Sequence, residues 1–305
     1  MAAETSCKTI FLTWVYSTRQ KRHVQLLIDN LRTFAGALSE CPIWIFETNP
    51  LQTNCKDLVS DNVRVLPLET PSTIKHYLYA DKVYACAQAE ELASPEVRSL
   101  VWLTAESLII QPPNLFDLDQ DADAAVRPVH IKNVGLLAEQ PLDDFWKQVY
   151  EVAGVEDIHT TVDSFVDDQH IRAYYNSAAF AVNPKTGVFS RWFDCFERLV
   201  GDQSFQTKTC QDERHQIFLH QAILSTLLVT MLDPSRMRIL PPEYVYPYNL
   251  HQDVPADRRA AVMNDLVCIY YEGRSLDPQL INDIKVYDPL SSWLSEHAKE
   301  ISSMS

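Results

Sequence analysis

Short apolar runs that alternate with longer amphipathic segments constrain the fold of this chain most strongly. The runs are rich in β-branched and aromatic residues, as in residues 9–15 and 100–103, and this composition is typical of buried strands. The first run is followed by a helical pattern in which Val24, Leu27 and Leu31 recur at three- and four-residue steps. Strands separated by helices predict an α/β fold, in which helices flank both faces of a mostly parallel central sheet.

The same alternation continues along the chain. We expect strands at residues 9–15, 42–46, 63–66, 100–103, 124–126, 178–182, 237–240 and 266–271, with an apolar segment at residues 108–110 beyond the fourth. We expect helices at residues 24–38, 74–92, 142–152, 185–200 and 214–231. No repeat or Gly/Ser-rich linker interrupts the pattern, which predicts a single domain over residues 1–305. Ligands of open α/β sheets bind at the carboxyl ends of strands, so the residues after positions 15, 46 and 103 are of most interest.

The charge balance disfavours several classes of partner. With 26 Lys+Arg against 41 Asp+Glu, the formal net charge is −15, and such a chain repels nucleic acids and anionic lipids. The longest apolar run, residues 222–232, is far shorter than the roughly 20 residues that a membrane-spanning helix requires. The first residues also lack a signal-peptide pattern. We therefore expect a cytoplasmic protein with no nucleic-acid partner and no membrane span.

The seven cysteines are scattered and never form a C-x-x-C pair. An odd number without paired spacing indicates neither a disulfide framework nor a zinc site. We expect most of them to be buried thiols that act as small apolar residues.

Several chemical motifs are absent or incomplete. An alternating run of aspartates resembles a calcium loop, but Ala122 and Pro128 stand where that loop has glycine and glutamate. His215 and His220 lack the spacing of a zinc protease. Neither a P-loop nor a G-x-G-x-x-G motif occurs, which disfavours a Rossmann dinucleotide site.

Several short segments between residues 79 and 274 follow one another in an order that is informative. A lysine-bearing helix precedes an apolar strand, and later segments contain Asn-Ser, His-Gln, Leu-Pro-Pro and Tyr-Asn pairs or triplets. Together they resemble the glycogenin-like branch (family 8 type) of retaining GT-A nucleotide-sugar glycosyltransferases. The residues that carry the resemblance are, in chain order, Lys82, Thr104, Ala105, Glu106, Asn176, Ser177, His220, Gln221, Pro241, Asn249 and Tyr270.

The resemblance implies a GT-A fold and transfer of a hexose from a nucleoside diphosphate sugar, with uridine diphosphate as the expected carrier, to a hydroxyl acceptor. In the family, a D-x-D motif and a late histidine hold a divalent ion, usually manganese, against the donor diphosphate. The corresponding residues here are Thr104, Glu106 and Tyr270, so only one carboxylate remains. We therefore assign no metal ligand and treat Mn²⁺ as a cofactor whose usual ligands are altered.

The resemblance also implies roles for individual residues. Asn176 and Ser177 are expected at the donor sugar, and His220 and Gln221 at the reacting face, so these four are the candidate catalytic residues. Each residue also has a purely structural interpretation. His220, for example, would then be a buried side chain whose hydrogen bonds are all made within the protein. The candidate donor-binding residues are Thr13, Tyr16, Lys82, Thr104, Ala105, Glu106, Arg127 and Tyr270.

The altered metal positions leave two hypotheses open. On the first, cations such as Lys82, Arg127 or protonated His220 stabilise the leaving diphosphate without a metal. On the second, the chain is a catalytically inactive protein that binds a nucleotide sugar or carbohydrate and keeps the fold. The sequence does not decide between an enzyme and such a binding protein.

Overall fold

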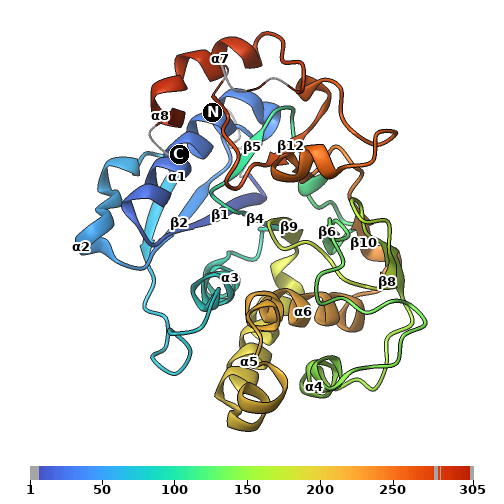
Figure 1. Cartoon of the computed structure of the whole chain (residues 1–305). Coiled ribbons are helices and arrows are strands. Elements are labelled where there is room, and N and C mark those ends of the chain that lie inside the picture. Colours follow the sequence, from blue (N-terminus) through green and yellow to red (C-terminus); the bar gives the residue numbers. More distant parts are fainter. Residues whose placement is uncertain (1–6, 278–280, 282, 303–305) are drawn as a thin grey trace.

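The computed structural model describes residues 7–277, 281 and 283–302. Its central sheet has seven strands in the order β10-β6-β9-β4-β1-β2-β3 (Figure 1). All neighbouring strands pair in parallel except that β9 runs antiparallel to β4 and β6. This confirms the predicted mostly parallel α/β sheet. The strands are β1 (Thr9–Val15), β2 (Ile43–Glu47), β3 (Val63–Pro67), β4 (Ser99–Leu103), β6 (Ala124–Val126), β9 (Ala179–Val182) and β10 (Met237–Ile239).

Helices cover both faces of this sheet, and β1 shows how the sequence permits this. All seven side chains of β1 are buried, and they alternate between two cores. Phe11 and Val15 pack with α1 (Thr18–Phe34). Leu12 and Trp14 belong to the opposite core, which Figure 1 shows below the sheet. The helices of that core are α3 (Ala80–Leu92), α4 (Asp144–Ala153), α5 (Val188–Gly201) and α6 (Glu213–Met231).

Smaller elements complete the fold. A second sheet contains β11 (Tyr246–Pro247), β12 (Cys268–Tyr270) and β5 (Ser107–Ile109), and a separate hairpin pairs β7 (Thr161–Asp163) with β8 (His170–Arg172). The short helices are α2 (Pro50–Thr53), α7 (Leu290–Glu296) and α8 (Ala298–Ser302). No helix in the described part of the chain is both long and apolar enough to cross a membrane.

The predicted start of the third helix was wrong. Apolar spacing predicted a helix from residue 74, but α3 begins at Ala80. Tyr79 has a φ angle of +62°, a left-handed conformation that cannot continue a right-handed helix. The preceding apolar residue Ile74 is buried in a turn instead. The change of direction at Tyr79 brings its ring to the carboxyl edge of the sheet.

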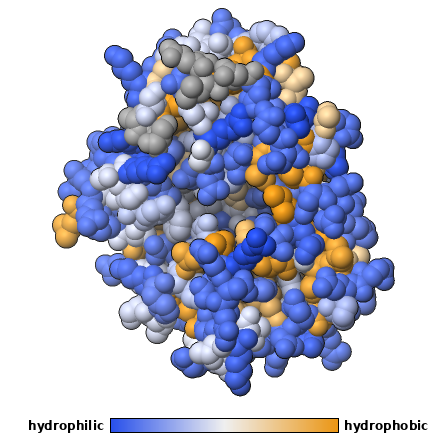
Figure 2. All heavy atoms as spheres, in the orientation of Figure 1, coloured by the Kyte–Doolittle hydropathy of each residue, from blue (hydrophilic) through white to orange (hydrophobic). Residues whose placement is uncertain are grey.

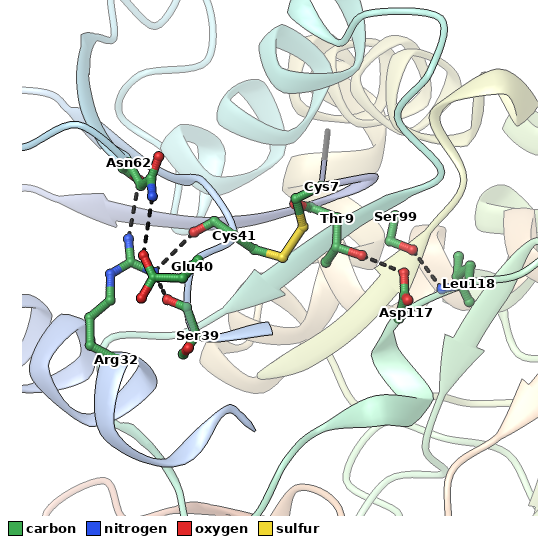
Figure 3. Close-up of a disulfide and its surroundings, with 10 residues drawn as sticks. All are labelled: Cys7, Thr9, Arg32, Ser39, Glu40, Cys41, Asn62, Ser99, Asp117 and Leu118. Carbon is green, nitrogen blue, oxygen red and sulfur yellow. Dashed lines mark hydrogen bonds between the residues drawn. A yellow bond between two sulfur atoms is a disulfide. The ribbon is translucent and has the colours of Figure 1, made fainter. Parts of the chain in front are cut away.

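The expectation of no disulfide was also wrong, because Cys7 and Cys41 are bonded to each other (Figure 3). The bond joins the segment that enters β1 to the segment that enters β2, and the two strands pair in parallel from Phe11 and Ile43 onward. Nearby, Arg32 donates to the carbonyl of Cys41 at 3.0 Å and to that of Asn62 at 3.2 Å. The other five cysteines are free and buried, as predicted. The disulfide lies at the amino-terminal edge of the sheet, away from the carboxyl ends of the strands.

We expect the Cys7→Ser variant to unfold more easily than the wild type. The disulfide closes a loop with a sequence separation of 34, and losing such a constraint raises the entropy of the unfolded chain by an amount worth about 2–4 kcal/mol. Urea unfolding would measure the difference. Dithiothreitol should lower the wild-type midpoint to that of the variant and leave the variant unchanged. Equal wild-type midpoints with and without dithiothreitol would contradict the prediction.

Candidate functional site

The candidate site lies where the central strands β1, β4 and β9 meet the loops that follow or precede them. Thr104 follows β4, and its backbone N–H donates to the carbonyl of Ala178 at 2.8 Å. The carbonyl of Glu106 accepts from the N–H of Tyr271 at 3.0 Å. These bonds join the end of β4 to the segments before β9 and after β12. Figure 2 shows that this face of the molecule is hollowed near its centre, in the region where Figure 1 places β4 and β9.

Two carboxylates meet at the end of β4. Burial, with the charge of Glu272, raises the pKa of Glu106 above its ordinary value, and the Thr104 hydroxyl lies 3.3 Å from a Glu106 carboxylate oxygen. The sequence analysis missed Glu272, because the resemblance directed attention to Tyr270. Its signal in the sequence was an acidic residue directly after the last buried strand. Two carboxylates therefore lie at this carboxyl edge of the sheet. Such a pair is typical of sites that bind a cation together with a phosphate ligand.

Three tyrosines surround these carboxylates. Tyr270 pairs with Ser107 across the small sheet, and Tyr16 and Tyr79 both pack against Trp14, with ring centroids 5.4 and 6.3 Å away. Burial, together with the nearby carboxylates, raises the pKa of Tyr79 to about 12 and that of Tyr270 further. The phenols therefore stay protonated at neutral pH and can donate hydrogen bonds to phosphate or sugar oxygens.

A buried polar network links β9 to α6 beside these residues. The hydroxyl of Ser177 lies 3.0 Å from Nε2 of His220 and 2.9 Å from Oε1 of Gln221. The backbone N–H of Ser177 also donates to Gln221 Oε1 at 3.2 Å. The structure thus brings together three of the four residues that the sequence analysis named as catalytic.

Asn176, the fourth, is directed differently. Its side-chain oxygen accepts from the N–H of Ala178 at 2.7 Å, which shapes the turn into β9. Its amide nitrogen lies 3.4 Å from Nδ1 of His130, a residue that the sequence analysis did not consider. Burial lowers the pKa of His130 to about 3, so this imidazole is neutral. Asn176 is half-buried at the site, and both ends of its side-chain amide have partners within the protein.

Lys82 is buried below the network and is not a solvated helix residue. Its Nζ donates to the carbonyl of Ser177 and lies 5.3 Å from the ring centroid of Trp102. Burial lowers the pKa of Lys82 to about 7. The lysine thus supports the backbone of Ser177, and at neutral pH it is only partly charged.

The buried lysine predicts a specific pH dependence of stability. Because the folded pKa is lowered, the unfolded chain binds more protons between about pH 7 and pH 10, and stability rises with pH in that window. We expect the free energy of unfolding of the wild type to gain about 2 kcal/mol from pH 7 to pH 9 relative to that of Lys82→Met. Urea unfolding of both proteins at each pH measures this difference. Parallel pH profiles would contradict it.

Three other predicted donor-binding positions are buried. Thr13 lies within β1 and is 1% exposed, so it cannot contact a nucleotide outside the sheet. Ala105 is fully buried and can offer only backbone atoms. Arg127 is buried, and its Nη1 donates to the carbonyls of Pro241, Pro242 and Tyr244. The guanidinium of Arg127 is therefore bonded to the segment that precedes β11.

Comparisons with known proteins agree with this arrangement. Residues 17–231, more than two thirds of the chain, match the model of the Rhodobacterales glycosyltransferase domain. The galactosyltransferase LgtC, solved in complex with donor and acceptor sugar analogs, superposes with a TM-score of 0.53 at 13% identity over 96% of both chains. The bifunctional glycosyltransferase WbbM superposes with a TM-score of 0.52 at 12% identity over 100% of this chain and 52% of its own. No curated protein sequence matches.

The structural likenesses establish the fold, and the family match covers the part of the site built by β4, β9 and α6, whereas Tyr16, Tyr270 and Glu272 lie outside it. The match extends from Ser17, beside Tyr16, to Met231 at the end of α6. It therefore includes β4, β9 and the network of Ser177, His220 and Gln221. The chain belongs to the Rhodobacterales glycosyltransferase family and has the GT-A fold.

Proposed function

We propose that the protein transfers a hexose from a nucleoside diphosphate sugar, with uridine diphosphate as the carrier, to a hydroxyl acceptor. The observation that carries this proposal is the meeting of Glu106 and Glu272 with the Ser177–His220–Gln221 network at one edge of the sheet. Family membership supports sugar transfer, and LgtC was solved with donor and acceptor sugar analogs. The comparisons do not favour the alternative, a catalytically inactive binding protein.

The donor would lie across the end of β4. Tyr16, 49% exposed after β1, would contact the nucleoside, and Thr104, Glu106 and Tyr270 would face the diphosphate. Asn176 and Ser177 would contact the sugar, with Gln221 behind them. Lys82 keeps its place beneath Ser177 as a support. This order places the sugar between the carboxylates and α6, where a reacting hydroxyl can approach it.

The residues at the diphosphate position fit a divalent cation. Hard cations such as Mg²⁺ are commonly bound by one or two carboxylates together with substrate phosphates, and Glu106 with Glu272 supplies that donor set. Such a cation would accept the negative charge that develops on the leaving diphosphate. Among the described residues, the one cluster of three metal-ligating side chains lies elsewhere, at Asp29, His297 and Glu300. The substrate would therefore have to complete the coordination.

Calorimetry tests the proposal directly. We expect uridine diphosphate to bind, and to bind more tightly with Mn²⁺ than with EDTA. Release of uridine diphosphate from UDP-glucose and UDP-galactose would then be measured under both conditions. Turnover in EDTA would support the metal-free hypothesis instead. Binding without turnover under any condition would favour the inactive binding protein, and no binding to uridine or guanosine diphosphate would refute the assignment.

A further inference from the structure

The hydrogen bonds of His220 determine which of its nitrogens carries the proton. Nδ1 lies 2.9 Å from the backbone carbonyl oxygen of Ile217. A carbonyl can only accept, so Nδ1 donates and the neutral ring has its lone pair on Nε2. Nε2 lies 3.0 Å from the Ser177 hydroxyl, whose single proton has two acceptors within reach, Nε2 of His220 and, at 2.9 Å, Oε1 of Gln221. A hydroxyl beside an imidazole that a third group orients is the geometry by which proteins remove a proton from an oxygen.

Packing holds the imidazole in this orientation. Tyr79 stacks on the ring with centroids 4.2 Å apart and planes 24° apart. Trp192 lies 6.3 Å away at 28°, and its indole N–H donates to the backbone carbonyl of His220 at 2.7 Å. Oε1 of Gln221 accepts the backbone N–H of Ser177 at 3.2 Å and lies 2.9 Å from its hydroxyl, so Gln221 holds Ser177 in place. Neither side chain is free to turn away.

The electrostatic surroundings keep His220 neutral before substrate binds. Burial, and then the charge of Lys82 on α3, hold the pKa of His220 well below its ordinary value. The other polar groups against the ring are the carbonyl of Ile217 on α6, the Ser177 hydroxyl before β9 and the phenol-bearing Tyr79. None of these brings a second positive charge. Nε2 is therefore available as an acceptor throughout the neutral pH range, and an anionic diphosphate nearby favours its protonation.

We propose that Ser177 and His220 form a proton relay for the acceptor hydroxyl, an inference that rests on the proposed sugar transfer. The acceptor oxygen forms a bond to the anomeric carbon, while the bond from that carbon to the diphosphate breaks and its electron pair leaves with the diphosphate. The acceptor proton passes to Oγ of Ser177, and the Ser177 proton passes to Nε2 of His220. After the products leave, His220 returns a proton to solvent.

The position of Ser177 suits this task. Its neighbour Ala178 accepts from Thr104 at 2.8 Å, so Ser177 stands directly beside the residues proposed for the diphosphate. With retention, the incoming hydroxyl approaches the anomeric carbon on the same face from which the diphosphate leaves, so a group beside the diphosphate residues can reach it. Ser177 would touch the reacting hydroxyl and is the catalytic residue, whereas His220 acts through it and is a positioning residue.

Kinetics of three variants test the relay, with UDP-galactose and UDP-glucose as donors and water as the acceptor hydroxyl. We expect Ser177→Ala and His220→Gln each to lower kcat for release of uridine diphosphate by about 10²–10⁴-fold, the usual contribution of general base catalysis. The double variant should lose no more than the worse single variant, because the two groups act as one unit. Calorimetric affinity for uridine diphosphate should stay within about threefold in all three.

Two readouts separate proton transfer from a structural role. Wild-type turnover should be slower in D₂O, and the isotope effect should shrink in Ser177→Ala. Added imidazole should restore part of the activity of His220→Ala, which retains a cavity for it. The matched control is Thr226→Val on the same helix, whose buried hydroxyl donates to the Ala222 carbonyl at 3.0 Å and should leave kcat unchanged.

The outcomes distinguish this inference from the proposed function. If the wild type turns over donor while Ser177→Ala keeps more than a third of kcat, the relay is wrong and the transfer assignment stands. The relay is also wrong if the fold-loss of kcat in the double variant equals the product of the two single fold-losses. The transfer assignment stands in that case too. If the wild type neither binds uridine diphosphate nor releases it from either donor, the proposed function fails, and the relay fails with it.

Discussion

Replacing Glu106 with glutamine should lower kcat/KM for donor turnover by about 10²–10³-fold. This is the usual effect of removing one group that stabilises charge in a transition state. Glutamine keeps the shape of the side chain but cannot carry the negative charge that holds a cation against the diphosphate. The enhancement of uridine diphosphate binding by Mn²⁺ should therefore disappear in calorimetry. The same loss is expected for Glu272→Gln, because the two carboxylates are proposed to bind one ion.

The stability of Glu106→Gln gives an independent check. The pKa of Glu106 is raised in the folded state, chiefly by burial and then by Glu272, so its charge disfavours folding at neutral pH. We expect the free energy of unfolding at pH 7 to stay the same or to rise while activity falls. Glu243→Gln, which removes an exposed carboxylate elsewhere, should change neither property. An active Glu106→Gln enzyme would remove this carboxylate from the site.

The second large effect is expected at Arg127, where Arg127→Met should cost about 3–5 kcal/mol of stability. The guanidinium donates to the carbonyls of Pro241, Pro242 and Tyr244 and lies 4.3 Å from the ring centroid of Phe165. Methionine would leave buried carbonyl oxygens without a donor, and each such loss costs about 1–3 kcal/mol. Urea unfolding would measure the change.

A neighbouring arginine provides the matched control for this prediction. Arg258 lies over the same Phe165 ring at 5.8 Å, but it is half-buried and pairs with an exposed carboxylate of Asp168 at 3.0 Å. Arg258→Met should change stability by less than about 1 kcal/mol, as is usual for surface ion pairs. If Arg127→Met instead kept full stability and lost affinity for uridine diphosphate, Arg127 would be the diphosphate cation that the sequence predicted.

The strands of the central sheet were predictable because their signal is local. The runs that form β1 and β4 are apolar at nearly every position, and such a run has few alternatives to burial between two helical layers. The motif order also predicted that Ser177, His220 and Gln221 are neighbours, because related proteins keep the order of the elements that carry them.

The errors share a different origin. Tyr79 looked helical because its neighbours have helical spacing, whereas in the structure it is left-handed and its ring stacks on Trp14 and His220. Arg127 looked like a free cation because sequence does not show that three carbonyls surround it. Cys7 and Cys41 looked unpaired because their spacing follows no motif, and only the parallel pairing of β1 with β2 brings them together.

The sequence by itself determined the layers of the molecule, since periodic burial follows from the spacing of apolar residues along one segment. The tertiary structure decided which polar groups meet, including Glu106 with Glu272 and Ser177 with His220. These partners are separated by many residues, so their contacts depend on strand order and on the positions of α6 and β12. The free-energy cost of burying a polar group depends on whether it finds such a partner. A local sequence pattern does not show which partner that is.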